Sequence, residues 1–221
     1  MGHNPQFIKA SLITAAFKEV LIHPYLVHTG QHYDDEMSEV FFREMNLTRP
    51  NVNLGIRSLG PGRQVGEMLV ALEDVMEDQK PDWVVVVGDT NSTLAGALAA
   101  AKLRIPLAHA EAGLRSYNRA MPEETNRVVA DHVSDILFVP TIGATECLRA
   151  EGIAGERVVL VGDVMYDAFL RFSSPGSVAP VPQRLSGDPF GGYALVTIHR
   201  AENTDDASRL ATIVHAVGLL A

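Results

Sequence analysis

The chain has 221 residues, of which 47% are hydrophobic and 20% are charged, an ordinary globular composition. Its net charge of −9 argues against a nucleic-acid-binding protein, which needs a basic face. No apolar run reaches the roughly 18 residues of a membrane-spanning helix, and Lys9 inside the apolar start of the chain is untypical of a signal peptide. The single cysteine excludes an internal disulfide and favours the reducing cytoplasm.

Short apolar runs alternate with amphipathic segments along the chain. The predicted strands are residues 25–30, 83–89, 106–111, 135–140, 157–162 and 193–199. The predicted helices are residues 5–20, 34–46, 63–79, 91–103, 122–133, 142–151, 164–172 and 205–220. The strands are apolar on both faces and rich in Val and Leu, as in parallel sheets buried between helix layers. The alternation therefore predicts an α/β fold with a Rossmann-type parallel sheet.

A segment rich in turn-forming residues precedes the last predicted strand and helix. Residues 173–192 contain four Ser, four Pro and four Gly, which predicts a linker between an N-terminal domain over 1–172 and a second unit over 193–221. One strand and one helix cannot bury a core, so the second unit is expected to open a further domain. The Asn4-Pro5 pair predicts a helix start with only three residues ahead of it. We therefore expect a missing first strand and a chain that is shortened at both ends.

Polar residues follow four of the predicted strands. Asp89 follows the run WVVVVG, Glu111 follows PLAHA and Asp163 follows RVVLVG, while His199 ends YALVTIH and Arg200 comes next. Ligands of open parallel sheets bind beyond the carboxyl ends of the strands. These residues are therefore the first candidates for a functional site.

Simpler structural roles compete with function at several of these positions. Asp163 directly precedes a helix, and the preference of Asp for the N-cap favours that role. Asp89 could also belong to a cap, but the valines ahead of it direct it to the ligand edge. Glu123 and Glu124 fit the first turn of a helix, where acidic residues suit the helix dipole. Arg127 could pair with Glu123 at a spacing of four residues.

Opposite charges crowd into residues 108–127, AHAEAGLRSYNRAMPEETNR. The stretch carries the carboxylates Glu111, Glu123 and Glu124 and three arginines. The sequence contains no metal-ligand motif, no GxGxxG or Walker loop and no serine nucleophile elbow. Carboxylates beside histidine and arginine suit acid–base chemistry next to an anionic group.

Eight blocks of the sequence together resemble the non-hydrolysing UDP-N-acetylglucosamine 2-epimerases. The blocks are NPQFIKA, HTGQH, GDTNSTLAGALAA, HAEAGLRS, MPEETNR, SDILFVPT, VGDVMYD and TIHRAENTD, and they occur in the family's order. The resemblance implies a GT-B-like fold of two Rossmann-like domains facing a cleft. This chain would be the first domain and the opening βα unit of the second.

The reaction that the resemblance implies is inversion of carbon 2 of a UDP-linked amino sugar. UDP is eliminated to leave a glycal, the proton returns on the other face, and UDP adds again. No cofactor and no metal are implied. The implied partners are the UDP-sugar substrate and a second copy of the chain, without nucleic acid or membrane. Such enzymes usually supply precursors of surface polysaccharides or cell walls.

The resemblance also implies roles for individual residues. Asp89, Glu111 and Glu123 would be the catalytic carboxylates that line the sugar pocket. His199 and Arg200 would contact the diphosphate, where cations stabilise the departing charge.

Four further residues are implied to bind substrate. Lys9 would lie near the nucleotide, and Arg115 would orient the carboxylates. Gln31 and His32 match a loop that contributes to a second, regulatory substrate site in the UDP-N-acetylglucosamine enzymes.

The chain departs from the family's pattern at both ends. Asn4 stands where the family has an arginine, no strand precedes it, and the chain ends before the family's uridine-binding Ser-Gly-Gly loop. We therefore expect this chain alone to bind UDP poorly and to be inactive.

The substrate and even the class of activity are open at this point. PQFIKA, GDTNSTLAGALAA and HRAENTDD look closer to the branch that acts on UDP-2,3-diacetamido-2,3-dideoxyglucuronic acid, so that sugar is the second candidate substrate. A GT-B glycosyltransferase or a non-catalytic fragment would also fit the sequence, because a fold does not fix a function.

Overall fold

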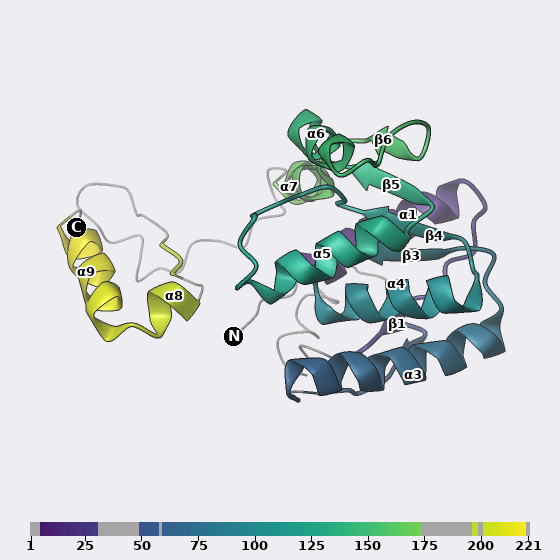
Figure 1. Ribbon diagram of the computed structural model, residues 1–221, viewed down its shortest axis with the longest axis horizontal. Coiled ribbons are helices and arrows are strands. Elements are labelled where there is room, and N and C mark those ends of the chain that lie inside the picture. The colour runs from purple at the N-terminus through teal and green to yellow at the C-terminus, as the bar shows by residue number, and fades with distance from the viewer. Residues whose placement is uncertain (1–4, 31–48, 58, 174–195, 199–200, 220–221) are drawn as a thin grey trace. The chain divides into compact units, whose positions relative to one another are not determined.

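The computed structural model of the chain describes residues 5–30, 49–57, 59–173, 196–198 and 201–219 (Figure 1). The chain divides into two compact units, Met1–Ser177 and Val178–Ala221. The predicted helix over 34–46 lies outside the described residues, as does the predicted linker over 173–192 apart from its first residue.

The first unit is centred on a parallel sheet with the strand order β3–β4–β5–β6. These strands are β3 (Val84–Val87), β4 (Leu107–Ala110), β5 (Ile136–Val139) and β6 (Val158–Leu160). All four residues of β4 are buried, as expected for a central strand covered on both faces. Each strand lies inside its predicted range, so the sequence placed the sheet correctly and overestimated only the strand lengths.

A second pair of strands is also parallel and short. It joins β1 (Val27–His28) to β2 (Val52–Asn53). The predicted strand over 25–30 is therefore confirmed only at its centre. The strand β2 was not predicted, because a two-residue strand produces no measurable alternation of apolar and polar residues.

Three helices form a layer on one face of the sheet (Figure 1). They are α3 (Pro61–Gln79), α4 (Asn91–Leu103) and α5 (Pro122–Val133), and α4 packs between the other two and against β3 and β4. The helix α4 is rich in Ala, and its small buried side chains let it approach the sheet closely. A Cβ atom added at Gly96 would lie 3.1 Å from Cγ1 of Val86, which is tighter than ordinary packing.

The remaining helices of this unit pack elsewhere on the sheet (Figure 1). The helix α1 (Pro5–Glu19) contacts β3 and α7 (Val164–Phe172), while α6 (Ile142–Ala150) contacts β5 and β6. The helix α7 begins with Asp163 as its N-cap, whose carboxylate accepts a 2.8 Å hydrogen bond from the amide of Met165. The predicted capping role of Asp163 is confirmed.

The second unit contains two described helices, α8 (Ala201–Thr204) and α9 (Ala207–Gly218). The predicted helix over 205–220 corresponds to α9, whereas α8 was not predicted, and Asp206 lies between the two helices. Its carboxylate caps α9 by accepting hydrogen bonds from the amides of Ser208 and Arg209, at 2.9 and 3.1 Å. These hydrogen bonds, with that from the Ser208 hydroxyl foremost, lower the pKa of Asp206. Residues 196–198 of the predicted strand over 193–199 are described and are not in a strand.

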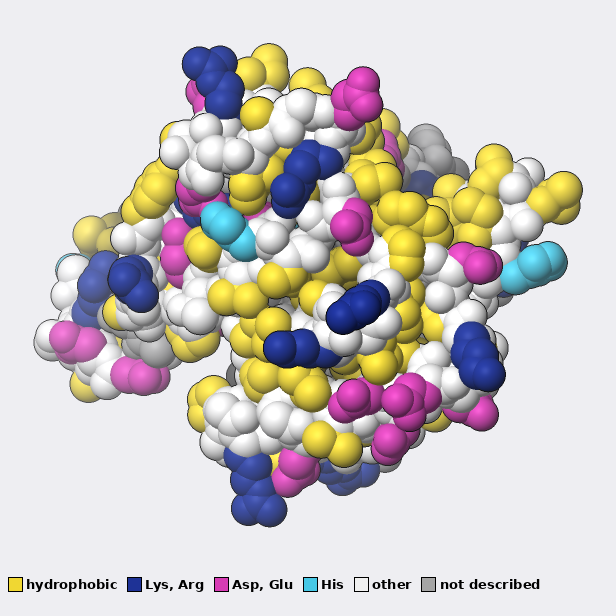
Figure 2. All heavy atoms as spheres, turned by 45° about the vertical axis from the view of Figure 1, so that its right-hand side comes forward, with side chains coloured by type: hydrophobic (Ala, Val, Ile, Leu, Met, Phe, Trp, Pro, Cys, Tyr) yellow, Lys and Arg dark blue, Asp and Glu magenta, His cyan; other side chains and the backbone are white. Residues whose placement is uncertain are grey.

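Figure 2 shows one face of the molecule, on which Lys and Arg side chains are scattered among Asp and Glu. On this face the basic side chains do not gather into a single large patch. Within the described residues, no helix is long and apolar enough to cross a membrane.

Candidate functional site

Two predicted carboxylates lie at the carboxyl ends of neighbouring strands. Asp89 follows β3 and Glu111 follows β4, and the register of the two strands pairs Val87 with Ala110. The amide of Gly88 donates to the carbonyl of Ala110 at 3.0 Å, so the ladder continues up to the residues that carry the site. The structure thus brings Asp89 and Glu111 to one edge of the sheet, the edge at which parallel α/β folds bind ligands.

Glu111 has an unusual backbone conformation. Its φ angle is +70°, which is uncommon for a residue other than glycine and costs about 1–3 kcal/mol. The next residues hold it there, because the Ala112 amide donates to the Phe138 carbonyl at 3.0 Å and the Gly113 amide donates to Asp131 at 3.1 Å. Strain of this kind occurs preferentially at functional sites.

The side chain of Glu111 pairs with one cation and faces an apolar space. Its carboxylate forms an ion pair with Lys9 of α1, and Lys9 is buried. Glu111 also lines a cavity of about 220 Å³, together with Ile13, Phe17 and Phe138. A carboxylate beside a largely apolar cavity is suited to proton transfer, because exclusion of water strengthens the electrostatic interactions there.

Asp89 is held in a similar way from α5. Its carboxylate pairs with the guanidinium of Arg127, and its backbone carbonyl accepts a 2.9 Å hydrogen bond from the side-chain amide of Asn126. The suggested pairing of Arg127 with Glu123 is wrong. Arg127 instead bridges Asp89 and Glu124, the latter at 3.1 Å, since the carboxylate of Glu124 faces the core side of the helix.

The two neighbouring glutamates at the start of α5 have different environments. Glu123 is exposed in the first turn, whereas Glu124 is buried. Glu124 accepts hydrogen bonds from the amides of Ser116 and Tyr117, both at 2.9 Å. Burial alone would raise the pKa of Glu124, but the hydrogen bonds from Ser116 and Tyr117 and the charge of Arg127 outweigh it and lower this pKa.

A second group of charges lies beneath this edge and is centred on Asp131. The carboxylate of Asp131 is fully buried in α5 and contacts the Nδ1 atom of His109 at 2.7 Å and the guanidinium of Arg115 at 2.7 Å. Arg115 also forms two hydrogen bonds with the carboxylate of Glu151, at 2.6 and 2.7 Å. We name His109, Arg115, Asp131 and Glu151 the closed cluster, and the pairs Lys9–Glu111 and Arg127–Asp89 the open pairs.

Charge balance explains how the closed cluster tolerates burial. The Nε2 atom of His109 lies 2.7 Å from the carbonyl oxygen of Gly88, and Nδ1 faces the carboxylate of Asp131. Both neighbours are hydrogen-bond acceptors, so each ring nitrogen of His109 faces a polar partner. Burial would raise the pKa of Asp131, but the hydrogen bonds and charges of His109 and Arg115 lower it. The buried charges of Asp131 and Arg115 are thus paired and hydrogen-bonded, as burial of charge requires.

Arg115 belongs to the closed cluster and does not contact the predicted carboxylates. Its guanidinium is only 1% exposed and bonds to Asp131, Glu151 and the carbonyl of Leu114. Burial would lower its pKa, but the hydrogen bonds to Glu151 and Asp131 raise it above the ordinary value. Arg115 was expected to orient the catalytic carboxylates. Its hydrogen bonds in the structure go to Asp131, Glu151 and Leu114 instead.

The other predicted binding residues, Gln31, His32, His199 and Arg200, lie outside the described residues. Over the part of the chain that the structure describes, no three His, Cys, Asp or Glu side chains gather as metal ligands would. What the described site offers is a set of carboxylates and cations that can exchange protons and neutralise negative charge.

Asp131 and His109 were not predicted as site residues from the sequence. One signal for Asp131 was present, because it falls on the buried face of α5 with Glu124 and Ala130. A carboxylate at a buried helical position requires a cation nearby. The sequence could not identify that cation, since His109 and Arg115 lie more than ten residues away along the chain.

Comparison with known proteins gives consistent results over nearly the whole chain. The protein family described as UDP-N-acetylglucosamine 2-epimerase matches residues 16–221. The UDP-2,3-diacetamido-2,3-dideoxy-D-glucuronate 2-epimerase of Pseudomonas aeruginosa is 49% identical over 220 residues, which are 98% of this chain and 61% of that protein. The UDP-N-acetylglucosamine 2-epimerase of Methanocaldococcus jannaschii is 44% identical over 221 residues, covering 98% of this chain and 60% of that one.

Solved structures agree with the sequence relatives. A crystal structure of the Methanocaldococcus jannaschii UDP-GlcNAc 2-epimerase in complex with UDP-GlcNAc and UDP superimposes with a TM-score of 0.83 and 43% sequence identity. The match covers 97% of this chain and 59% of that chain. The chain thus spans about three fifths of the length of the relatives it matches. The predicted fold class, a parallel α/β sheet of the GT-B-like type, is confirmed by this likeness.

Proposed function

Because the chain belongs to the UDP-N-acetylglucosamine 2-epimerase family, we propose that it carries the acid–base part of an enzyme that inverts carbon 2 of a UDP-linked amino sugar. One observation supports this most strongly. Asp89 and Glu111 lie at the carboxyl ends of adjacent strands, and each is paired with a single cation. Proton removal from carbon 2 and proton return on the other face need two such groups.

The proposed reaction breaks the bond between carbon 2 and its hydrogen and the bond between carbon 1 and the UDP oxygen. A double bond then joins carbons 1 and 2. The two steps next run in reverse: a proton adds to carbon 2 from the opposite face, and the UDP oxygen bonds to carbon 1 again. We assign Asp89 and Glu111 to the proton transfers, with Glu123 as a third carboxylate at the exposed start of α5. The strained φ angle of Glu111 suits this role, since it fixes the direction of the carboxylate.

The cations of the open pairs have a second proposed role. Lys9 and Arg127 compensate the charge of the carboxylates, and either can turn toward an anionic substrate when a carboxylate gains a proton. His199 and Arg200 remain our proposal for the diphosphate contacts, and Gln31 and His32 for a regulatory site. Arg115 becomes a positioning residue, because it acts through Asp131 on the Gly113 amide next to the Glu111 loop.

The test of the proposed function is hydrogen exchange at carbon 2. The chain is extended to the length of the Pseudomonas aeruginosa relative with that relative's remaining residues and incubated with UDP-N-acetylglucosamine in deuterated water. Replacement of the carbon-2 proton by deuterium, followed by NMR, is the expected result. A folded protein that binds UDP without any exchange would contradict the proposal and favour a glycosyltransferase-like or purely binding role.

A second substrate should be tested in the same way. The relative with 49% identity acts, by its name, on UDP-2,3-diacetamido-2,3-dideoxy-D-glucuronate. That substrate carries a carboxylate, so an enzyme that prefers it needs one more cation in the sugar pocket. Parallel exchange measurements with the two UDP-sugars at equal concentration would decide between them.

We further propose that the full-length protein is a cytoplasmic homodimer that supplies a precursor of surface polysaccharide, with residues 193–221 opening its nucleotide-binding domain. The resemblance to the family supports the dimer and the role in polysaccharide synthesis, and the single cysteine supports the cytoplasmic location. Light scattering of the extended chain would test the dimer, for which a mass of one chain at micromolar concentration would be the contradicting result.

A further inference from the structure

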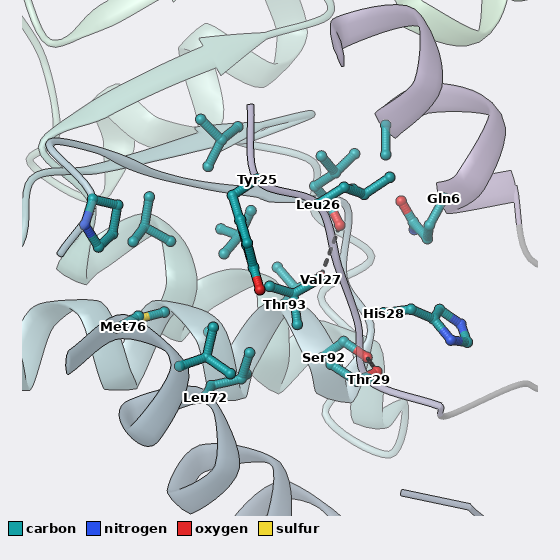
Figure 3. A pocket seen from close by; sticks show the side chains of 18 of the residues that line it. Gln6, Tyr25, Leu26, Val27, His28, Thr29, Leu72, Met76, Ser92 and Thr93 are labelled. Atoms are coloured by element: carbon teal, nitrogen blue, oxygen red, sulfur yellow. Dashed lines mark hydrogen bonds between the residues drawn. The ribbon is translucent and has the colours of Figure 1, made fainter. Parts of the chain in front are cut away.

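The end of β3, which leads into Asp89, is fixed by side chains from other elements. Thr93 of α4 lines a cavity of about 270 Å³ beside this strand, and its hydroxyl donates a 2.8 Å hydrogen bond to the carbonyl of Val87 (Figure 3). In β4, the Nε2 atom of His109 lies 2.7 Å from the carbonyl oxygen of Gly88. Two successive carbonyls at the end of the strand are therefore bound by side chains, as buried backbone groups require.

The next carbonyl along the chain is that of Asp89, and it is bound from α5. The side-chain amide of Asn126, a buried residue, donates a 2.9 Å hydrogen bond to it. Helix α4 begins only after this carbonyl, because its first hydrogen bond runs from the amide of Leu94 to the carbonyl of Thr90 at 3.1 Å. The peptide group of Asp89 thus lies between the sheet and the helix, and the hydrogen bond from Asn126 fixes it there.

The amide of Asn126 is itself oriented by two further side-chain amides. Its nitrogen also donates to Oδ1 of Asn91 at 3.1 Å. The amide nitrogen of Asn91 donates to Oε1 of Gln64 at 2.8 Å, and that of Gln64 donates to the carbonyl of Arg57 at 3.2 Å. We name Asn126, Asn91 and Gln64 the amide chain. It joins α5, α4 and α3 behind the strand end that carries Asp89.

The amide chain has one possible direction, because both of its ends meet backbone carbonyls. A carbonyl only accepts, so an NH2 group must face Asp89 at one end and Arg57 at the other. Rotation of any one amide by 180° would place oxygen against oxygen and leave polar groups unsatisfied. The three side chains therefore hold one another in a single orientation, and hydrogen bonds in such a chain strengthen one another.

Asp89 is thus held from α5 by two neighbouring residues that bind different parts of it. Arg127 pairs with the carboxylate, and Asn126 binds the main-chain carbonyl. In the proposed function the ion pair opens when Asp89 gains a proton and Arg127 turns toward the anionic substrate. The hydrogen bond from Asn126 ends on a peptide carbonyl, whose charge stays the same in the reaction. It can therefore persist when the ion pair opens.

From this geometry we propose that Asn126 is a positioning residue, which the amide chain orients and which keeps the peptide group of Asp89 in place while the carboxylate exchanges its proton. A misplacement of about 1 Å can slow an enzymatic reaction roughly 10²-fold, so a fixed peptide group has a direct effect on rate. The effect on rate rests on the proposed function. The hydrogen bonds of the amide chain do not depend on it.

The first measurement detects the hydrogen bond without any substrate. In the isotope-labelled chain, we expect NMR to show a scalar coupling across the hydrogen bond between the side-chain nitrogen of Asn126 and the carbonyl carbon of Asp89. Asn91→Ala removes the second acceptor of the Asn126 amide and should weaken this coupling. Absence of the coupling from the unsubstituted chain would overturn the proposal. An unchanged coupling in Asn91→Ala would contradict the part of the proposal that assigns orientation to the amide chain.

The second measurement follows carbon-2 exchange in the extended chain. Asn126→Leu replaces the amide by an apolar side chain of similar size. We expect kcat to fall about tenfold or more while KM changes less than about threefold, because Asn126 binds the main chain of Asp89 and not the sugar. Asn53→Leu is the matched control. Asn53 is exposed, its side-chain oxygen accepts a 3.0 Å hydrogen bond from the nearby amide of Gly55, and its loss should leave kcat unchanged.

Two kinetic results would overturn the positioning role. The first is a loss of stability in Asn126→Leu with unchanged kcat in the folded protein, which would make Asn126 a purely structural residue. The second is an equal fall of kcat in Asn53→Leu, which would show a general effect of losing an asparagine. Absence of exchange from the unsubstituted extended chain would instead contradict the proposed function. The NMR coupling would then still decide whether Asn126 fixes the peptide group of Asp89.

Discussion

The open pairs and the closed cluster contain the same kinds of charged groups but differ in how many partners each carboxylate has. Asp131 in the closed cluster accepts hydrogen bonds from His109, Arg115 and the amide of Gly113. Glu111 and Asp89 in the open pairs each have one cationic partner and remain partly exposed. A carboxylate with several fixed donors holds its charge firmly, whereas one with a single cation can exchange that partner for a substrate or a proton.

This difference suggests a division of labour at the same sheet edge. The closed cluster reaches the backbone on both sides of the site, through Gly88 next to Asp89 and through Gly113 near Glu111. It can therefore fix where the strands end, while the open pairs remain available for chemistry. Substitutions in the closed cluster should therefore lower stability most, and substitutions in the open pairs should lower activity most.

The largest expected loss of stability follows from breaking the closed cluster. Asp131→Asn removes the anion that faces His109 and Arg115 and leaves the buried guanidinium of Arg115 with Glu151 as its remaining carboxylate partner. We expect the free energy of unfolding to fall by about 3–5 kcal/mol, measured by urea denaturation. A loss below about 1 kcal/mol would show that the cluster is not held together by its charges.

Acid should weaken the fold through the same carboxylate. The pKa values of Asp131 and Glu124 are lowered in the folded protein, so the unfolded chain binds protons more readily than the folded one. Their stabilising contribution is complete above the ordinary carboxyl pKa of about 4 and is lost as the pH falls through the lower folded values. We expect the free energy of unfolding to decrease below about pH 4, less steeply in Asp131→Asn. Equal slopes would contradict this assignment.

A smaller effect is expected at an open pair. Arg127→Gln removes the cation that bridges Asp89 and Glu124 and should lower the free energy of unfolding by about 1.5–3 kcal/mol. Arg63→Gln is the matched control, since Arg63 forms an exposed pair with Glu67 at 2.9 Å and should change stability by no more than about 1 kcal/mol. Thermal unfolding of the two variants side by side makes the comparison. Equal losses would mean that burial of Arg127 has no energetic consequence.

The smallest effect on stability is expected at Glu123. Its side chain is exposed in the first turn of α5, so Glu123→Gln should change the free energy of unfolding by less than about 1 kcal/mol. If Glu123 takes part in proton transfer, carbon-2 exchange in the extended chain will nevertheless fall. Unchanged exchange would remove Glu123 from the catalytic set.

The placement of Asp89 and Glu111 could be predicted from the sequence, because it follows from a local rule. Each residue ends a buried apolar run, and parallel strands align their carboxyl ends. The cap at Asp163 is equally local and was also predicted correctly. The helix α9 lies within its predicted range, but its cap at Asp206 and the short helix α8 before it were not predicted.

The closed cluster could not be predicted, because its members come from β4, the loop after it, α5 and the end of α6. The residues Arg115 and Glu151 are 36 positions apart, and only the packing of α6 beside the sheet brings them together. Which of Glu123 and Glu124 is enclosed could not be predicted for the same reason. Either glutamate fits the first turn of a helix, and only the loop at Ser116 and Tyr117 determines which one is enclosed.

The most direct measurement compares Glu111→Gln with Glu151→Gln, the same chemical change in an open pair and in the closed cluster. Deuterium incorporation at carbon 2 is measured in the extended chain at a temperature where both variants are folded. We expect Glu111→Gln to slow exchange by about 10²–10⁴-fold in the folded protein, and Glu151→Gln to retain exchange within severalfold. Equal loss of exchange in both variants, or full exchange in Glu111→Gln, would contradict the separation of chemistry from structural support.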